Sequence, residues 1–237
     1  MTQRILITGA NRGIGLEMTR QALARGDSVI AACRVPDKAA ALDELAAAHG
    51  DALTIIGLEA RTEASFQAAA AMTTPLDLVV ANAGTMNARG GLTDAGHTED
   101  NIADSLMTNI AGVFFTARHF LANLQAGADS RAAGIIPRIA VISSQMGSSE
   151  RAGTNAPIYR ATKAAATNLA RSMALELAEH GIAVGAWHPG WVQTDMGGAG
   201  AAITAEVSAA GLLQRFDALT MATSGVFETY EGEPLPF

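Results

Sequence analysis

Residues 4–15 read RILITGANRGIG, a short apolar run that leads into a turn with three glycines. The apolar run predicts a strand over Arg4–Thr8, and the pattern that follows predicts a helix over Gly13–Arg25. Glycine lets the backbone turn sharply, and the first turn of a helix offers free N–H groups and a positive dipole end. Such a turn suits a pyrophosphate when it joins the first strand and helix of a dinucleotide-binding fold. A plain tight turn is the alternative.

Further apolar runs alternate with longer helical patterns along the rest of the chain. Strands are predicted at Ser28–Cys33, Leu53–Leu58, Leu76–Ala81, Arg138–Ser143, Ile182–Trp187 and Gly225–Tyr230. Helices are predicted at Pro36–Ala48, Thr62–Met72, Asn101–Leu124, Tyr159–His180 and Ala205–Leu219, and Gly127–Gly134 is predicted as a loop. Continuous apolar runs are typical of strands buried on both faces of a parallel sheet. We therefore predict one α/β domain over residues 1–237, a doubly wound, Rossmann-type parallel sheet of about seven strands with helices on both faces.

The composition limits the class of protein. Of the 237 residues, 49% are hydrophobic and 16% charged, which is enough apolar material for a core and too little charge for disorder. A net charge of −7 without a basic cluster argues against nucleic acid as a partner. No run reaches the roughly 18 apolar residues of a membrane helix, and no signal-like segment is seen. With Cys33 as the single cysteine, a cytoplasmic location is expected.

Tyr159 and Lys163 form the most informative pair of side chains. The chain has two tyrosines, and only two of its 16 basic residues are lysines. Residues four apart in a helix lie on the same face. A nearby positive charge favours the phenolate of a tyrosine, whose ordinary pKa is about 10. The pair can therefore act as an acid/base group. The alternative is a helix face with an aromatic residue and a solvated lysine.

Five further motifs accompany this pair in a fixed order. They are TGANRGIG at 8–15, NAG at 82–84, TNIAG at 108–112, SSQMG at 143–147 and PGWVQT at 189–194. Together with YRATK at 159–163, they make the chain resemble the short-chain dehydrogenase/reductase family from residue 4 to about residue 196. The resemblance implies an NAD(P)-dependent oxidoreductase that acts on CH–OH and C=O groups.

The resemblance also implies a catalytic group. Tyr159 would be the general acid when a carbonyl is reduced and the base in the reverse direction. Lys163 would stabilise its phenolate and hold the nicotinamide ribose. Ser144 would bond the substrate oxygen, and Asn109 would position a water near Lys163. Only one of Ser143 and Ser144 can face the site if the strand continues, and the spacing to the following glycine favours Ser144.

The same motifs imply a set of cofactor-binding positions in the glycine turn and at the ends of the following strands. They are Gly9, Asn11, Arg12, Gly13, Ile14, Arg34, Leu58, Glu59, Asn82, Ala83, Gly84, Tyr159, Lys163, Pro189, Gly190, Val192 and Thr194.

The second strand ends without the acid that would bind a ribose 2′-hydroxyl. Arg34 stands there instead, and Arg12 is a second cation that can face a 2′-phosphate, so we predict NADP(H) in preference to NAD(H). Two solvated surface arginines are the alternative. Glu59 stands where the family usually carries an aspartate, so adenine recognition is expected to rest on backbone groups there.

A substrate pocket is predicted from the segments Met146–Pro157, Trp191–Ala210 and Thr85–His97. Met146, Trp191, Met196 and Leu212 predict an apolar wall, which suits an apolar ketone or aldehyde. Ordinary loop packing is the alternative. Glycines at 197, 198 and 200 predict a mobile lid within a substrate loop at about 190–212. The segment from His188 to Gly198 resembles a C-factor-like branch of the family, related to some carbonyl reductases. His188 itself is expected to be packed or hydrogen-bonded rather than catalytic.

The expected partners follow from the same reading. A small carbonyl or alcohol substrate is implied, with neither nucleic acid nor a membrane, and no histidine pair has metal-ligand spacing, so no metal is predicted. In the family, the helices that correspond to those with Asn109 and Tyr159 commonly make a four-helix subunit interface, which implies a homodimer or homotetramer. The alternative function is an NADP(H)-binding regulatory or signalling protein that needs no turnover.

Overall fold

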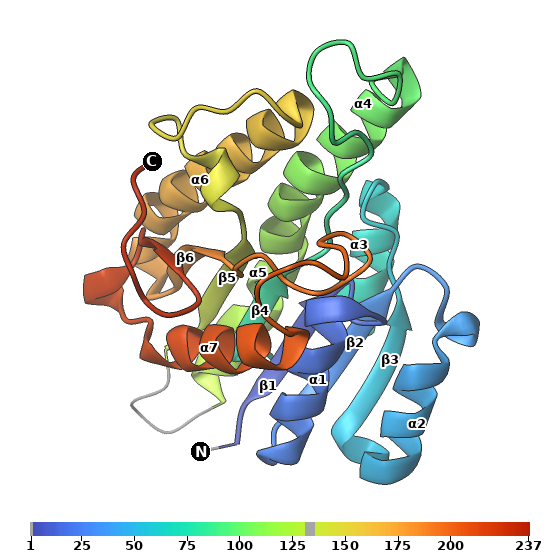
Figure 1. Cartoon of the computed structure of the whole chain (residues 1–237). Coiled ribbons are helices and arrows are strands. Elements are labelled where there is room, and N and C mark those ends of the chain that lie inside the picture. Colours follow the sequence, from blue (N-terminus) through green and yellow to red (C-terminus); the bar gives the residue numbers. More distant parts are fainter. Residues whose placement is uncertain (1, 131–135) are drawn as a thin grey trace.

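Seven parallel strands form one sheet in the order β3-β2-β1-β4-β5-β6-β7 in the computed structural model, which describes residues 2–130 and 136–237 (Figure 1). The strands are β1 (Arg4–Thr8), β2 (Ser28–Cys33), β3 (Leu53–Gly57), β4 (Leu78–Ala81), β5 (Arg138–Ile142), β6 (Ala183–His188) and β7 (Phe227–Thr229). The helices are α1 (Gly13–Ala24), α2 (Ala40–His49), α3 (Glu63–Ala71), α4 (Glu99–Leu106), α5 (Gly112–Asp129), α6 (Pro157–Glu176) and α7 (Ala205–Ala218). This order confirms the predicted doubly wound sheet.

Two apolar layers cover the faces of the sheet. Helices α1, α2 and α7 pack on one face through side chains such as Met18, Leu42 and Phe216. Helices α3, α5 and α6 pack on the other face, where Phe66 and Phe120 are fully buried. Because both faces are covered, the strands consist of almost continuous apolar residues.

The strand order reverses beside β1. From β1 the chain builds outward to β2 and β3, then crosses over to β4 and continues to β7 on the opposite side. Ligands of open α/β sheets bind outside the carboxyl ends of the strands at such a reversal. The residues that follow β1, β4, β5 and β6 meet at this edge, and they include most of the predicted site.

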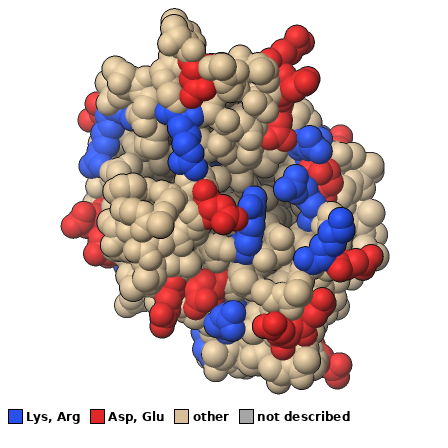
Figure 2. Space-filling view, turned by 45° about the vertical axis from the view of Figure 1, so that its right-hand side comes forward, with Lys and Arg blue, Asp and Glu red and all other residues tan. Residues whose placement is uncertain are grey.

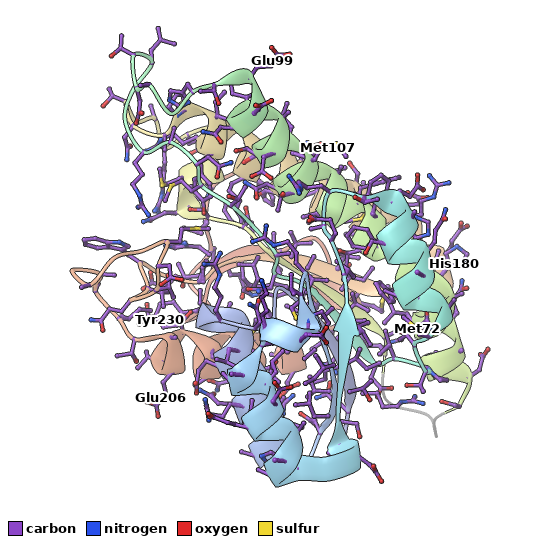
Figure 3. The ribbon with its side chains drawn as sticks, turned by 90° about the vertical axis from the view of Figure 1, so that its right-hand side faces the viewer. Met72, Glu99, Met107, His180, Glu206 and Tyr230 are labelled. Atoms are coloured by element: carbon purple, nitrogen blue, oxygen red, sulfur yellow. The ribbon has the colours of Figure 1, made fainter. Side chains whose placement is uncertain are left out.

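The predicted helix over Asn101–Leu124 is helical throughout, but it starts earlier, ends later and contains a π-helical turn that divides it into α4 and α5. The chain begins α4 at Glu99, because the Thr98 hydroxyl accepts a hydrogen bond from the N–H of Asn101 at 3.2 Å. A wider, π-helical turn over Met107–Ala111 then separates α4 from α5, and its start is seen at Met107 in Figure 3. Such turns have no sequence signature and often lie at functional sites.

Smaller differences concern the ends of elements. Pro36–Lys38 forms a separate 3₁₀ turn before α2. Helix α6 begins at Pro157, and the last turn of the predicted helix, Leu177–His180, is 3₁₀. In the predicted loop Gly127–Gly134, α5 continues to Asp129, and residues 131–135 lie outside the described part.

Candidate active site

The glycine turn after β1 is built by close backbone approach. Gly9 and Gly13 have φ angles of 67° and 55°, in the left-handed region that favours glycine. A Cβ atom on Gly15 would lie 2.3 Å from the Gly9 carbonyl oxygen and 2.6 Å from the Asn82 side-chain nitrogen. No other residue fits at position 15 without moving the turn. This compact loop at a helix N-terminus fits the group that the motif implies, because it exposes backbone N–H groups to an anion.

Thr8 joins the glycine turn to the NAG segment at 82–84. Its buried hydroxyl accepts hydrogen bonds from the N–H groups of Asn82 and Ala83, both at 3.0 Å, and donates to the Val80 carbonyl at 3.3 Å. The Asn82 side chain donates in return to the Thr8 carbonyl at 2.8 Å. The predicted site does not include Thr8, although this threonine is the first residue of the motif at 8–15.

Asn109 lies in the π-helical turn, fully buried. Its side-chain oxygen accepts from the Thr85 N–H at 2.8 Å, and its nitrogen donates to the Thr85 carbonyl at 2.8 Å and to the Thr162 hydroxyl at 3.0 Å. It therefore fastens the segment after the NAG motif to α6. A Cβ atom on Gly84 would lie 3.4 Å from both Asn109 Oδ1 and Lys163 Nζ, so all three residues meet at one point.

Lys163 is almost completely buried, with 4% of its surface exposed. Its Nζ donates to the Ile142 carbonyl at 2.7 Å and lies 5.8 Å from the centre of the Tyr159 ring. Burial lowers the pKa of the Lys163 ammonium to about 8. The lysine therefore remains mostly protonated at neutral pH, although it sits in an environment that disfavours its charge.

The Tyr159 hydroxyl does not behave as the sequence alone suggested. Burial raises the pKa of Tyr159 to about 12, and a hydrogen bond with the Ser144 side chain offsets only part of this rise. Lys163 is not among the causes of this shift, since its ammonium donates to the Ile142 carbonyl. Tyr159 therefore carries its proton at neutral pH.

The two serines after β5 have different partners. Ser143 Oγ bonds to the Lys163 carbonyl at 3.1 Å and to the Thr167 hydroxyl at 2.6 Å, within the core. Ser144 Oγ accepts from the Met146 N–H at 3.1 Å and also bonds with Tyr159. Ser144 therefore faces the predicted acid, and Ser143 fastens β5 to α6.

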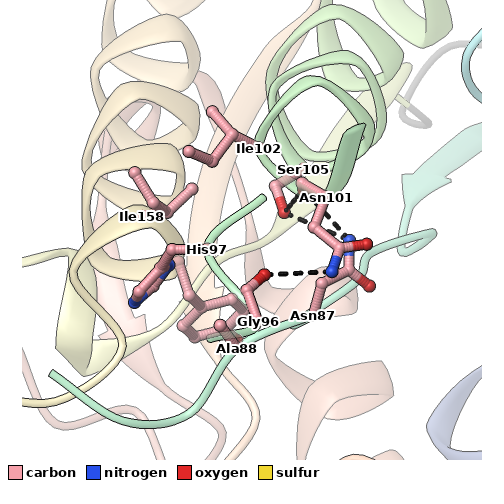
Figure 4. Close-up of a pocket in the computed structure, with 9 residues that line it drawn as sticks. Asn87, Ala88, Gly96, His97, Asn101, Ile102, Ser105 and Ile158 are labelled. Carbon is pink, nitrogen blue, oxygen red and sulfur yellow. Dashed lines mark hydrogen bonds between the residues drawn. The ribbon is translucent and has the colours of Figure 1, made fainter. Parts of the chain in front are cut away.

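A small pocket lies beside Tyr159, between the loop at 87–97, α4 and the start of α6 (Figure 4). The Asn101 side chain donates to the Gly96 carbonyl at 3.0 Å, and Asn87 donates to the Asp104 carboxylate at 2.7 Å. These bonds hold the loop against α4. Asn87, Ala88, Gly96 and His97 lie within the segment 85–97 that the sequence predicts at the pocket. The lining residues that the sequence does not predict are Asn101, Ile102, Ser105 and Ile158. No motif marks them, because they are brought together by the loop's tertiary contacts.

The predicted substrate wall is only partly assembled. Met146 and Met196 are half-buried, and Trp191 is 57% exposed, with its indole N–H donating to the Gly197 carbonyl at 2.9 Å. Leu212 is fully buried against the apolar layer of α1 and α7, so its assignment to the wall is wrong. The helical period of α7 turns this side chain toward the sheet.

The segment that follows β6 lies against the glycine turn. Val192 is buried and bridges to Ile203, and a Cβ atom on Gly13 would lie 3.2 Å from the Thr194 methyl group. Pro189 accepts a hydrogen bond from Ser208 at 2.6 Å. The predicted positions from 189 to 194 therefore reach the same edge as the glycine turn.

The two arginines predicted to face a 2′-phosphate differ in their partners. Arg12 pairs with Asp195 at 2.9 Å, and both side chains are exposed. Arg34 is exposed and has no ion pair among residues 2–130 and 136–237, although its charge helps to lower the pKa of Glu59. The Glu59 carboxylate is held by Arg61 at 3.2 Å. Figure 2 shows basic and acidic side chains next to one another around a hollow on this side of the molecule.

His188 ends β6 with 9% of its surface exposed. Burial lowers its pKa to about 4, with a smaller contribution from the charge of Arg151, and its Nδ1 has no hydrogen-bond partner in the described part of the chain. It is packed, as expected, but that nitrogen is not hydrogen-bonded.

Residues 2–130 and 136–237 contain no cluster of three His, Cys, Asp or Glu side chains arranged to hold a metal ion. Among these residues there is also no helix with the length and apolar character to cross a membrane.

The reversal in the sheet, the glycine turn and the Ser144–Tyr159–Lys163 group define an oxidoreductase that uses a nicotinamide dinucleotide. The family described as short chain dehydrogenase matches residues 3–202, and the chain belongs to this family. The C-signal of Myxococcus xanthus is 34% identical over 166 residues, which cover 70% of this chain and 95% of that protein.

Two solved structures share the whole fold. The NADPH-bound carbonyl reductase from chicken fatty liver has a TM-score of 0.90 at 33% identity and covers 100% of this chain and 99% of its own. The carbonyl reductase Sniffer of D. melanogaster has a TM-score of 0.90 at 28% identity, with 100% of both chains covered. The protein is thus an NAD(P)-dependent short-chain oxidoreductase similar to carbonyl reductases.

Proposed function

We propose that the protein reduces an apolar ketone or aldehyde to an alcohol with NADPH, or catalyses the reverse reaction, with Tyr159 as the general acid/base. One observation carries this proposal: Ser144 faces the protonated Tyr159, whose ring centre lies 5.8 Å from the Nζ of the buried Lys163. Met146, whose N–H bonds to Ser144, offers apolar surface beside this group, and Trp191 offers more on the predicted substrate loop, which favours an apolar substrate. The neighbour from chicken liver, described as an NADPH-bound carbonyl reductase, supports the same reaction class.

The residues of the chain divide the chemistry among them. The glycine turn, the NAG segment and residues 189–194 would hold the dinucleotide, whose nicotinamide supplies or accepts the hydride. Tyr159 donates its proton to the substrate oxygen, and Ser144 donates a hydrogen bond to the same oxygen as negative charge develops on it. The Lys163 ammonium then stabilises the phenolate that is left. Asn109 keeps α6 and the NAG segment in register, and we propose that a water near Lys163 returns the proton.

Arg34 is the residue that we propose for the 2′-phosphate. Arg12 is a second candidate, but Asp195 competes for its guanidinium at 2.9 Å. Arg34→Asp should therefore abolish the preference for NADPH over NADH, measured as the ratio of kcat/KM values. Unchanged selectivity in this variant would contradict the assignment.

Tyr159→Phe tests the proposed acid. The variant keeps the ring and loses only the hydroxyl, so NADPH binding should remain within a few-fold while turnover falls by roughly 10²–10⁴. The assay is NADPH oxidation against a panel of ketones, aldehydes and quinones, with fluorescence titration for binding. Substantial residual reduction by the variant would exclude Tyr159 as the acid.

A second candidate function is a regulatory or signalling protein that binds NADP(H) without turnover. The similarity to a protein named C-signal favours it. The intact acid group argues against it, because a sensor needs no proton donor. Tight NADPH binding without oxidation on any member of the panel would support the sensor.

We propose further that the whole chain is one catalytic domain, that residues 190–212 close over the substrate, and that the protein acts in the cytoplasm. We also propose a homodimer or homotetramer through the helices that carry Asn109 and Tyr159. Leu106, Met107 and Phe114 leave exposed apolar surface along this part of the molecule, which supports the proposal. Sedimentation as a monomer at micromolar concentration would refute it.

A further inference from the structure

Arg160, the neighbour of Tyr159 in the first turns of α6, has an unusual set of partners. Its Nε donates to the Asn155 carbonyl at 3.0 Å, and its Nη1 donates to the Arg151 carbonyl at 3.0 Å. Nη1 also reaches the Met146 carbonyl at 3.4 Å, and Nη2 donates to the Asn155 side chain at 3.3 Å. One guanidinium therefore contacts both ends of the loop at 146–155.

The loop's other side-chain hydrogen bonds are short-range: Arg151 Nη1 donates to the Gln145 side chain at 2.8 Å, and the Glu150 N–H donates to Ser148 Oγ at 3.3 Å. Residues 149–155 are exposed and contribute no side chain to either apolar layer. The Ala156 N–H donates to the Gly90 carbonyl at 2.8 Å, which ties the end of the loop to the segment that borders the pocket. Gly153 lies directly on Arg160, since a Cβ atom there would be 2.0 Å from Nη2. The loop is thus folded around the guanidinium.

The same contacts lead to the proposed acid group. The backbone of Met146 connects Arg160 to Ser144. The Met146 N–H donates to Ser144 Oγ at 3.1 Å, and the Met146 carbonyl accepts from Arg160. Ser144 in turn bonds with Tyr159. A change in the position of Arg160 is therefore transmitted both to the loop and to the serine.

We propose that Arg160 is a positioning residue that fixes the loop at 146–155 as a wall of the substrate opening, and thereby determines which carbonyl compounds reach Tyr159. The inference deepens the proposed reductase function and rests on it for its catalytic part. Arginine suits this role because its planar fork donates to several acceptors at once, whereas lysine presents a single point of charge. A bulky carbonyl compound makes more contacts with the wall than a small one and depends more on its position.

Two variants perturb the contact from opposite sides. Arg160→Gln removes the fork, and Gly153→Ala adds a methyl group that displaces it. Gly153 does not have a positive φ, so alanine is compatible with the backbone. Arg160→Lys keeps the charge without the fork. Arg20→Gln on α1 is the matched control, since it removes an exposed arginine whose one ion pair among the described residues is with Glu17 at 3.3 Å.

We expect Arg160→Gln and Gly153→Ala to raise KM for a bulky ketone by about tenfold and to change KM for a small aldehyde by less than about threefold. The Kd for NADPH should stay within about twofold, because Arg160 is not among the predicted cofactor positions, and Arg160→Lys should not restore KM. Equal KM values for both substrates in all variants, or full rescue by lysine, would overturn the proposal.

Hydrogen exchange gives a readout that needs no turnover. Amides of residues 149–156 should exchange at least about tenfold faster in Arg160→Gln, while those of α5 and α7 keep their protection. Unchanged protection in the loop would overturn the proposal even if the variant is active. If the wild-type protein reduces none of the panel while the loop loses protection, the proposed function fails and the structural role of Arg160 stands. If the circular dichroism spectrum shows that Arg160→Gln is unfolded, Gly153→Ala takes its place in both experiments, because it leaves every arginine in place.

Discussion

Lys163→Met should raise the unfolding free energy relative to the wild type by more at neutral pH than at alkaline pH. Burial lowers the pKa of this lysine from 10.5 to about 8. In the folded protein the ammonium is therefore more costly than in the unfolded chain. At 1.36 kcal/mol for each pH unit between the two values, the cost is about 3 kcal/mol. It is fully present below pH 8 and disappears as the pH rises to 10.5.

The test is the difference in unfolding free energy between Lys163→Met and the wild type, measured in urea at pH 7 and pH 10 without nucleotide. The wild type gains stability over this range because its unfolded state binds the additional proton, and the variant lacks this gain. The unfolding free energy of Lys163→Met minus that of the wild type should therefore fall by about 2.5 kcal/mol from pH 7 to pH 10.

Two contributions do not affect this comparison. Loss of the hydrogen bond to the Ile142 carbonyl, 2.7 Å in length, adds an offset that does not vary with pH. Groups elsewhere titrate in both proteins and cancel in the difference. Lys38→Met is the control, because it removes the other lysine from an exposed position. A difference between Lys163→Met and the wild type that is the same at pH 7 and pH 10 would refute the reasoning.

Two further predictions concern the polar contacts around the site. Thr8→Val should lower the unfolding free energy by about 2–4 kcal/mol, because two N–H groups lose a buried acceptor, whereas Thr8→Ser should cost less than about 1 kcal/mol; equal urea midpoints would contradict this. Ser144→Ala should lower kcat by about 10²-fold with little effect on stability. Ser143→Ala should instead lower the unfolding free energy by about 1 kcal/mol with little effect on kcat, since the Ser143 hydroxyl bonds inside the core. A large loss of kcat in Ser143→Ala and none in Ser144→Ala would show that Ser143 is the serine that acts on the substrate.

The sequence predicts the sheet well because each strand is a continuous apolar run bounded by polar residues. The run Ser28–Cys33 has the predicted bounds, flanked by Asp27 and Arg34. The ordered motifs also predict that Asn82 and Ser144 lie near each other, because both follow strands whose carboxyl ends meet at one edge. In a parallel sheet, residues that directly follow neighbouring strands therefore lie close together even when they are far apart in the sequence.

Other features depend on tertiary contacts that no spacing reveals. The break at Met107–Ala111 follows from a wider turn that contains Asn109, and its residues have no distinctive pattern. The i, i+4 spacing of Tyr159 and Lys163 predicts their common face, but it does not reveal desolvation, which moves the pKa of the tyrosine upward. Arg160 looks like any helical arginine until the loop at 146–155 is seen folded around it.

The buried polar groups at the two ends of the sheet show why one end carries chemistry. At the amino ends of the strands, Asp77 pairs with Arg4 at 3.1 Å, and Asp27 accepts from the Gln3 N–H at 2.8 Å. Arg138 lies at the same end, and burial lowers the pKa of its guanidinium. A guanidinium nevertheless remains charged in proteins, so it cannot exchange a proton.

At the carboxyl ends the groups are the phenol of the half-buried Tyr159 and the ammonium of the buried Lys163, both of which can exchange protons. Burial moves their pKa values toward the neutral forms, to about 12 for Tyr159 and about 8 for Lys163. The neutral phenol is the form that can give up a proton to a carbonyl oxygen. In the proposed mechanism, a nearby lysine that is still charged stabilises the phenolate. The same burial that costs stability at Lys163 would then favour proton transfer at this end of the sheet, whereas Asp77 at the other end is paired with Arg4.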